Sequence, residues 1–451
     1  MSAGTVATWM LAALLVWAPM PFGGVTRGGQ LALQLWAFTT LAAALASGLE
    51  PVWRRVRKAV VPGLAIAGVA VLGVMQSMTW PASVVARVSP EHERVRQSAG
   101  LAGTPAATLS LAPSTSRTVA LTWLAAAAVL IAAATVSRDL VARRIVVGGM
   151  LGGAVLQVAF GGRHLAGQSG TIWGVEVPED PGRLRGTFVN PDHCGTYLLI
   201  ALAVTFACGV VAVRRARERP LEQRIMLVAG PVLGWGTLFL ALAFTGSRGA
   251  MVGATVGTLA QGVMLAMSSR RRSFGPIGIP IVMAGVVAVT FVGFQEGLGR
   301  WLAMTSLDAS WEDRRHVYGL TVALWRRFPL LGSGLATFRD AFPLVQPRGL
   351  EGSWWHAHSD VLELLATTGV VGGVMIAAGL LVTLKRLAVL LVRGSRTEDR
   401  AMALAGLGAL CAIGFHETVD FGLTMPATAF TLVSLLGAAL AIPVEGDPAP
   451  R

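Results

Sequence analysis

The sequence predicts an all-α, polytopic membrane protein of about 12 transmembrane helices, and three observations lead to this fold class. Hydrophobic residues make up 54% of the 451 positions and charged residues only 14%, whereas a soluble domain needs about 25% charged residues to cover its surface. The apolar residues form long runs that can cross roughly 30 Å of hydrocarbon as helices. Because these runs do not alternate with period two, a β-barrel is not expected.

Twelve apolar runs, rich in Leu, Ala, Val and Gly, are expected to span the membrane. In chain order they are 5–22, 30–48, 59–77, 119–136, 145–160, 194–213, 225–244, 250–267, 277–294, 358–383, 400–415 and 423–442. Two of them, 145–160 and 400–415, are short, since a helix needs about 20 residues to cross the bilayer. The longest stretch between runs, 295–357, separates the ninth and tenth spans and is expected to be the largest water-exposed loop.

The basic residues predict the orientation of the spans. With the N-terminus inside, the short inner loops are dense in Arg and Lys, and the clusters lie at 54–58, 138–144, 214–224, 270–272 and 385–400. This distribution follows the positive-inside rule and makes both termini cytoplasmic. The net charge of +13 therefore does not indicate nucleic-acid binding, because the basic residues are spread through loops and do not form one soluble domain.

The outer loop 295–357 contains a predicted surface helix. Residues 310–313, Ser-Trp-Glu-Asp, have the pattern of a helix N-terminus, with a serine cap and an acid three residues later. The helix should end at Pro329 and Gly332 and lie along the membrane surface as a lid. Its apolar face is expected to consist of Val317, Leu320, Leu324 and Phe328. The tryptophans expected in the interfacial aromatic belt are Trp301, Trp311, Trp325, Trp354 and Trp355.

Four ionisable residues lie where this loop enters the tenth span: His356, His358, Asp360 and Glu363. Such groups are costly at membrane depth, which favours a functional interpretation, and the alternative is an interfacial polar cap on the helix. If the helix begins by residue 356, His356, Asp360 and Glu363 share one face. His358 would then point about 200° away from His356, so periodicity alone does not select His358.

Arginines form a second group of candidates. Arg248 is the only charge in a tight outer turn between two spans, and we expect its guanidinium to be buried there. The planar fork of arginine suits phosphate oxygens, whereas a snorkelling interfacial arginine is the alternative. Arg314 and Arg315 begin the predicted surface helix, where a solvated helix face is the ordinary interpretation.

No metal site or disulfide is expected. Cys194, Cys208 and Cys411 form no Cys-x-x-Cys pair, and no two of them share an outer loop.

Five stretches carry a family resemblance. His358-Ser359, followed after nine residues by Gly369-Val370-Val371-Gly372, fits a pattern of His, a small polar residue, nine residues, Gly, two residues and a small residue. The others are residues 245–249 (Thr-Gly-Ser-Arg-Gly), Arg314 four residues before Tyr318 with residues 329–334 downstream, residues 416–421 and residues 185–193. With these motifs, and with their order along the chain, the sequence resembles the O-antigen ligase and polymerase superfamily. Its members are bacterial inner-membrane enzymes that transfer glycans from a polyprenyl-pyrophosphate carrier.

The resemblance implies a division of the chain and a reaction. Residues 185–451, with periplasmic loop 295–357, would form the ligase-like region, and residues 1–184 would add transmembrane helices and outer loops. The donor would be an undecaprenyl-pyrophosphate-linked glycan, the acceptor lipid A core or a growing glycan, and the site would face the periplasm among membrane lipids. No cofactor is expected, because the first outer loop, 23–29, contains no acid. Metal-dependent lipid-linked glycosyltransferases of similar topology are expected to carry acids in that loop.

The resemblance also assigns roles to residues. Arg248 and Arg314 would hold the diphosphate, and His358 would orient or deprotonate the acceptor hydroxyl, with inversion at the anomeric carbon. These three are the predicted catalytic residues. The residues expected to bind substrate are Arg315, His356, Asp360, Glu363, Arg185, Asn190 and His193.

Two other classes of protein are considered. A secondary transporter would also explain twelve spans, but transporters place charges near the midplane and show repeat symmetry, and neither is visible here. An intramembrane hydrolase would need a nucleophile such as Ser247 or Ser333 next to His358, and no motif ties either serine to that histidine.

Overall fold

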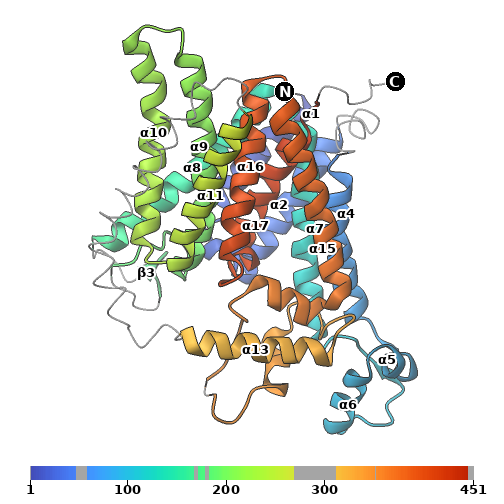
Figure 1. Ribbon diagram of the computed structural model, residues 1–451. Coiled ribbons are helices and arrows are strands. Elements are labelled where there is room, and N and C mark those ends of the chain that lie inside the picture. Colours follow the sequence, from blue (N-terminus) through green and yellow to red (C-terminus); the bar gives the residue numbers. More distant parts are fainter. Residues whose placement is uncertain are drawn as a thin grey trace.

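The computed structural model describes residues 2–46, 58–166, 171–177, 182–268, 311–350 and 352–444, which are mostly helical and contain almost no sheet. The helices form one bundle, and the first and last described residues lie at the same end of it, here named the termini end (Figure 1). The opposite end, which carries α13 (Trp311–Arg327) and the connection 417–425, is named the loop end. The predicted all-α class is thus confirmed.

The bundle is built from eleven described helices. They are α1 (Ala3–Trp17), α2 (Arg27–Leu45), α4 (Val60–Ser77), α7 (Pro113–Val136), α8 (Leu140–Leu165), α9 (Pro191–Ala216), α10 (Leu221–Phe244), α11 (Arg248–Ser268), α15 (Asp360–Arg393), α16 (Thr397–His416) and α17 (Pro426–Leu440). Short elements connect them: η1 (Phe22–Gly24), β1 (Trp80–Pro81), α5 (Ala82–Val88), α6 (Pro90–Ser98), β2 (Ala106–Ala107), β3 (Thr171–Ile172), β4 (Val175–Glu176), α14 (Phe338–Ala341), η2 (Phe342–Leu344) and η3 (Gly422–Thr424). Strand β1 pairs with β2, and β3 with β4, both antiparallel.

Seven described helices are long and apolar enough to cross a membrane: α4, α7, α8, α9, α10, α11 and α15. The chain is therefore a multi-pass membrane protein. Helices α1, α2, α16 and α17 lie where four more spans were predicted. The predicted ninth span, 277–294, is outside the described residues, so the count of twelve and the position of the loop after that span remain predictions.

Helix α15 corrects the predicted bounds of the tenth span, 358–383. It begins at Asp360, so the condition under which His356, Asp360 and Glu363 would share one helix face is not met. It continues to Arg393 through the predicted inner loop. The extension is helical because Leu387, Leu390 and Leu391 continue the buried stripe toward the termini end. At 1.5 Å per residue, its 34 residues extend about 50 Å, longer than the hydrocarbon core.

Small residues bring the central helices close together. A Cβ on Gly253 of α11 would lie 2.8 Å from the Ala412 carbonyl oxygen of α16, and one on Gly257 would lie 2.7 Å from the Ala412 Cβ. This Gly-x-x-x-Gly spacing lets two helix backbones approach closely. Such packing is common in membranes, where the hydrophobic effect does not drive helices together because lipid tails are equally apolar. The buried core also contains nearly all of α17.

A break in α15 shapes the loop end. Gly369 has φ 65° and ψ −168°, a backbone conformation that is not helical and that interrupts α15. The segment 329–334 fits into the break, since Val370 N donates to the Pro329 carbonyl (2.9 Å) and Ser333 N to the Ala366 carbonyl (3.0 Å). From α4, the fully buried Gln76 donates to the Thr367 carbonyl (3.2 Å) and accepts from Leu335 N (2.8 Å). Because Gln76 satisfies backbone groups of both α15 and the segment that crosses it, it stabilises the break.

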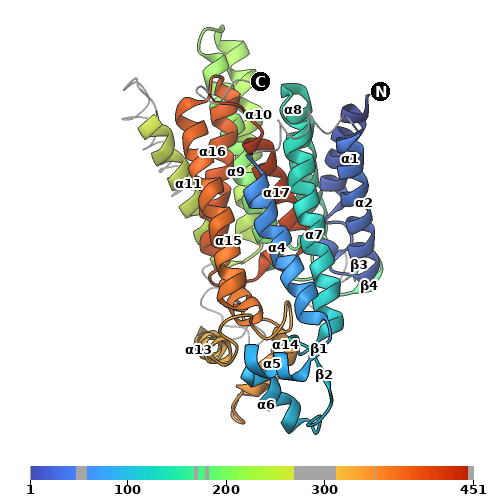
Figure 2. The same cartoon turned by 90° about the vertical axis from the view of Figure 1, so that its right-hand side faces the viewer.

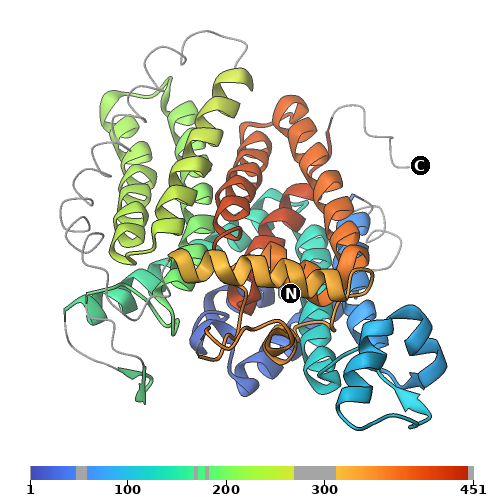
Figure 3. The same cartoon turned by 60° about the horizontal axis from the view of Figure 1, so that its bottom comes forward.

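Helix α13 crosses the loop end beneath the bundle (Figure 3), and α5, α6 and α14 gather at the same end (Figure 2). The predicted apolar face is confirmed, because Val317, Leu324 and Phe328 are buried in a small second core with Leu320 packed against it. Arg327 ties α13 to α6, with Nε 2.6 Å from Glu91 Oε1.

The predicted aromatic belt stays a prediction. Trp325 and Trp354 pack against the second core beneath α13, whereas Trp355 is exposed. Trp301, the Trp311 side chain and the expected serine cap at 310 lie outside the described residues.

Candidate functional site

The backbone at His358 is held in a rarely used conformation. Its φ is 52°, in the left-handed region that a residue with a side chain seldom adopts. Tyr318 Oη of α13 donates to the His358 carbonyl (3.0 Å). On the other side, Asp360 N donates to the carbonyls of Glu417 and Asp420 (both 3.0 Å). Strain of this kind persists only where surrounding contacts impose it, and it is concentrated at functional sites.

The His358 imidazole has one ring nitrogen buried without a partner. Its Nδ1 is buried without a hydrogen-bond partner among the described residues, and its ring meets Phe421 edge-on at 5.1 Å. Burial, with the Arg314 guanidinium as the next cause, lowers the pKa of His358 to about 4. The ring is therefore neutral at pH 7, the protonation state that a general base requires.

His356 forms a pair with a carboxylate. Its Nδ1 lies 3.0 Å from Glu363 Oε1 of α15, and Ala357 N donates to Glu363 Oε2 (2.9 Å). Burial acts to lower the pKa of His356, but the charge and hydrogen bond of Glu363 outweigh it and raise that pKa. This contact arises although residue 356 lies before the helix, because the loop folds back over the first turn of α15.

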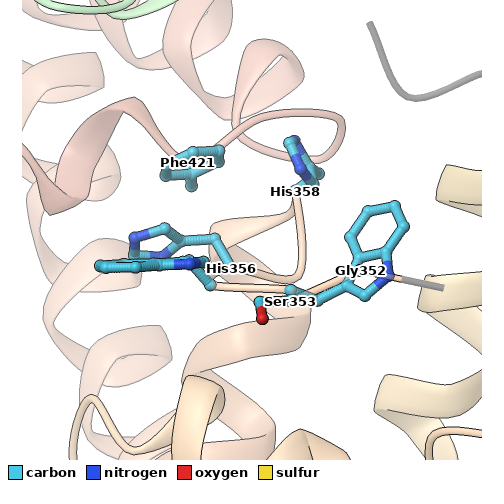
Figure 4. Close-up of a pocket in the computed structure, with 7 residues that line it drawn as sticks. Gly352, Ser353, His356, His358 and Phe421 are labelled. Carbon is cyan, nitrogen blue, oxygen red and sulfur yellow. The ribbon is translucent and has the colours of Figure 1, made fainter. Parts of the chain in front are cut away.

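Phe421 joins the histidines. Its ring stacks on His356 with centroids 4.2 Å apart, and it meets His193 edge-on at 4.6 Å. Figure 4 shows Phe421 over His356, with His358 beside both. No role was predicted for Phe421, since an aromatic residue in an apolar stretch gives no signal beyond its place in the motif 416–421.

The connection that carries Phe421 also buries carboxyl groups. Burial raises the pKa of Glu417 and that of Asp420 to about 7. Leu423 N donates to Asp360 Oδ2 (3.0 Å) and to Glu417 Oε2 (3.3 Å). Asp360, predicted to bind substrate, thus lies in this cluster beneath the His358 loop.

Arg314 and Arg315 lie in the first turns of α13, and Arg314 faces the histidine cluster. Its side chain is half-buried, and its Nε is buried without a hydrogen-bond partner among the described residues. Its charge also acts on Asp420 and on His358. Arg315 is exposed. The two neighbours therefore differ in orientation, which the sequence could not decide.

Arg248 is exposed, so the expectation of a buried guanidinium is wrong. It is the first residue of α11, and the tight turn before it contains Gly246 at φ 67°. The next residue, Gly249, packs on the fully buried His416, because a Cβ there would lie 3.0 Å from the imidazole Cδ2. His416 Nε2 is 3.5 Å from Asp420 Oδ2. The start of α11 is thus linked through His416 to the connection that carries Phe421.

The segment 185–193 enters α9 beside this cluster. Arg185 is buried and its Nη1 donates to the Val189 carbonyl (3.4 Å). Asn190 Oδ1 accepts from Asp192 N (2.8 Å), so this side chain caps α9. His193 is buried against Phe421. The roles of Arg185, Asn190 and His193 in substrate binding stay predictions.

Arg183 was missed because it precedes the recognised motif by two residues. Its Nη2 lies 2.6 Å from Asp192 Oδ1, and its Nε donates to the Thr245 carbonyl (2.6 Å). Arg183 therefore joins the start of α9 to the turn that contains Arg248. Only tertiary contact reveals this, since 62 residues separate Arg183 from Thr245.

The two serines considered as nucleophiles have other partners. Ser247 Oγ accepts from Ala250 N (3.3 Å). Ser333 Oγ lies 2.9 Å from Thr337 Oγ1 and 3.3 Å from the Ala366 carbonyl. Ser247 serves a local turn, and Ser333 joins its own turn to α15, which gives no support to a serine–histidine hydrolase.

A pocket of about 330 Å³ lies against His358. Its lining comes from the loop before α15 and from the connection between α16 and α17 (Figure 4). The residues that line it are Gly352, Ser353, Trp354, Trp355, His356, His358 and Phe421. Among the described residues, no group of three or more His, Cys, Asp or Glu could hold a metal ion.

The fold and this site define a multi-pass helical membrane protein with a cluster of histidines, carboxyls and arginines at one end of its bundle. Residues 233–377 match the family model described as O-antigen ligase. This domain match supports the resemblance to the O-antigen ligase and polymerase superfamily that the motifs predicted. The match spans about a third of the chain and includes Arg248, Arg314 and His358. No curated protein matches the chain.

The family match supports membrane glycan transfer of the O-antigen ligase type. In that family the reaction joins a lipid-linked glycan to an acceptor such as lipid A core.

Proposed function

We propose that the protein moves a glycan from undecaprenyl pyrophosphate to a sugar hydroxyl at the periplasmic face of the bacterial inner membrane. Both termini would be cytoplasmic. Residues 185–451 would carry the reaction, and residues 1–184 would support them. The acceptor is lipid A core in a ligase or a growing glycan in a polymerase. The observation that carries the proposal is the neutral imidazole of His358, which lines the pocket from a strained backbone position and is acted on by the charge of Arg314.

The reaction balances with the side chains of this site. The acceptor oxygen attacks the anomeric carbon while the bond from that carbon to the phosphate oxygen breaks, which inverts the configuration. The acceptor proton passes to His358, and the electron pair leaves on the diphosphate. Arg248 and Arg314 stabilise the negative charge that develops there, so the diphosphate leaves without need of a metal ion.

Donor binding would also tune the base. The Arg314 charge is one cause of the low pKa of His358. A bound diphosphate would offset that charge and raise the pKa of His358 toward the working pH, where a general base is most effective. The base would thus be strongest when the donor is in place.

A reconstitution assay tests the proposal. Purified protein in nanodiscs receives lipid-linked oligosaccharide with either lipid A core or further repeat units, with and without EDTA. Product length distinguishes ligase from polymerase, and unchanged turnover in EDTA is the expected result. His358→Ala, Arg248→Ala and Arg314→Ala should each abolish transfer while the protein still inserts into the membrane.

Arg326→Ala is the matched control, because Arg326 lies on the same helix as Arg314 but is exposed. It should retain transfer. Wild-type turnover by His358→Ala would remove the proposed base, and loss of activity with His356→Ala alone would move that role to His356.

The transporter alternative finds less support. The ionisable residues described above lie at the loop end, and the family match concerns a glycan ligase. A transporter would place such groups near the midplane.

A further inference from the structure

The pocket beside His358 has an exposed aromatic wall. Trp355 is 57% exposed although it lines the pocket. The guanidinium of Arg339 from α14 lies 3.7 Å from the centre of the Trp355 ring. A cation over one face of an indole is favourable and restrains the ring. Trp355 is thus held in one orientation although more than half of its surface is open.

The rest of the pocket supplies hydrogen-bonding groups. Glu363 holds His356 Nδ1 at 3.0 Å, and stacking on Phe421 fixes the plane of the imidazole. Nδ1 is therefore occupied, which leaves Nε2 as the ring nitrogen for a ligand. His358 lines the same pocket, so any ligand there is adjacent to the proposed base.

A sugar ring matches this combination. Its C–H faces are apolar and pack on aromatic rings, and its hydroxyls both donate and accept hydrogen bonds. A lipid tail would leave the imidazoles unpaired. The pocket volume of about 330 Å³ corresponds to about eleven water molecules at about 30 Å³ each, which is enough room for a terminal sugar.

We infer that this pocket is the acceptor subsite: the terminal acceptor sugar stacks on Trp355, a neighbouring hydroxyl bonds to His356, and the reacting hydroxyl meets His358. The inference rests on the proposed function for the role of the sugar as acceptor. Sugar binding itself does not depend on transfer, so the two can be tested apart. Trp355 is a binding residue in this account, and Glu363 positions His356.

Binding is measured by saturation-transfer NMR on the full chain in nanodiscs. Two lipid-free probes are used, core oligosaccharide released from lipopolysaccharide and an oligosaccharide of one repeat unit. We expect at least one probe to bind, and Trp355→Ala to weaken its binding about tenfold. Trp355→Phe should retain most of the affinity because an aromatic face remains.

Trp9→Ala is the matched control, since Trp9 is 54% exposed but lies on α1, away from the pocket. It should bind the probes like the wild type. Thermal unfolding of each variant separates loss of the pocket wall from loss of the fold. Wild-type affinity in a folded Trp355→Ala variant would overturn the inference.

Transfer kinetics separate this inference from the proposed function. Trp355→Ala should raise KM for the acceptor about tenfold with little change in kcat and none in KM for the donor. An increase in the donor KM alone would assign the pocket to the donor and reject the inference. If the wild type transfers no glycan but binds a probe through Trp355, the proposed function fails and the sugar subsite stands. If Trp355→Ala transfers glycan with an unchanged acceptor KM, the proposed function stands and the sugar subsite is rejected.

Discussion

His358 shows how a single residue is prepared by its neighbours. A left-handed conformation costs a residue with a side chain about 1–2 kcal/mol. Hydrogen bonds from Tyr318 to its carbonyl and from Asp360 N to the connection 417–425 impose that conformation. The result is an imidazole held against Phe421 and near Arg314, which neither local helix propensity nor spacing would produce.

The charge of Arg314 should control the titration of His358. Arg314→Gln removes a positive neighbour, so the imidazolium becomes less unfavourable and the pKa of His358 rises from about 4. It should remain below the ordinary value of 6.5 because burial persists. NMR titration of ¹³C-labelled histidines measures this shift, with His358→Ala to assign the signal and Arg326→Gln as control. An unchanged pKa would show that Arg314 does not face His358 in solution.

At the scale of elements, the break in α15 determines where the site residues lie. The break at Gly369 admits the segment 329–334, and that segment connects α13 to the bundle. The nine residues between His358-Ser359 and Gly369 therefore form the stretch of α15 that separates the proposed base from the break. The family pattern has a physical meaning here, because both ends of it are fixed by backbone contacts.

Gly369→Ala should disrupt this crossing. A Cβ there would lie 2.2 Å from the Leu330 carbonyl oxygen, and φ is 65°. We expect a loss of about 3 kcal/mol or more, combining strain and steric overlap, together with loss of transfer. Scanning fluorimetry measures the fall in Tm. Gly414→Ala in α16 is the control, since its Cβ would meet nothing within 4 Å. Equal Tm values for the two variants would contradict the account of the break.

At the scale of the whole molecule, a buried ion pair joins the helices at the termini end. Arg143 Nη1 of α8 lies 2.7 Å from Asp399 Oδ1 of α16, and both side chains are almost fully buried. Asp399 Oδ2 also accepts from Arg396 N (3.2 Å), so the same carboxylate caps α16. The interaction fixes one end of the bundle while the loop end carries the proposed site.

Arg143→Met should cost about 3–5 kcal/mol, because it leaves the Asp399 charge buried without its partner. Adding Asp399→Asn removes that charge and retains the cap, so the double variant should recover part of the loss. Chemical or thermal unfolding measures both. Arg215→Ala serves as control, since its pair with Glu398 is about half exposed and should contribute less than about 1 kcal/mol. If the double variant is no more stable than Arg143→Met, an unpaired charge is not the cause.

The orientation of the molecule can be tested by labelling. In a background without Cys194, Cys208 and Cys411, a single cysteine is placed at Ser353 or at Ser2, both exposed. Ser353 precedes α15 at the loop end, and Ser2 precedes α1 at the termini end. An impermeant maleimide added to intact cells should label Ser353→Cys and not Ser2→Cys. Permeabilised cells give the total for each. Labelling of Ser2→Cys alone would place the site on the cytoplasmic face.

The spans and the surface helix were predictable because hydropathy and helical periodicity are local properties. The run 194–213 became α9, and Val317, Leu324 and Phe328 formed the face expected of α13. The helix break was not predictable, since one glycine in an apolar run is compatible with an unbroken helix. Nor was the exposure of Arg248, because a turn between spans does not fix the direction of a long side chain.

The sequence by itself determined that this chain is a helical membrane protein and which motifs carry its family resemblance. Hydrophobic transfer into a bilayer depends on runs of neighbouring residues, and motifs are short. Only the tertiary structure decided that His356 pairs with Glu363, that Phe421 packs on three histidines, and that Arg183 joins α9 to the turn before α11. Such contacts require the chain to fold back on itself, and directional hydrogen bonds and ring packing exist only after the helices and their connections have come together.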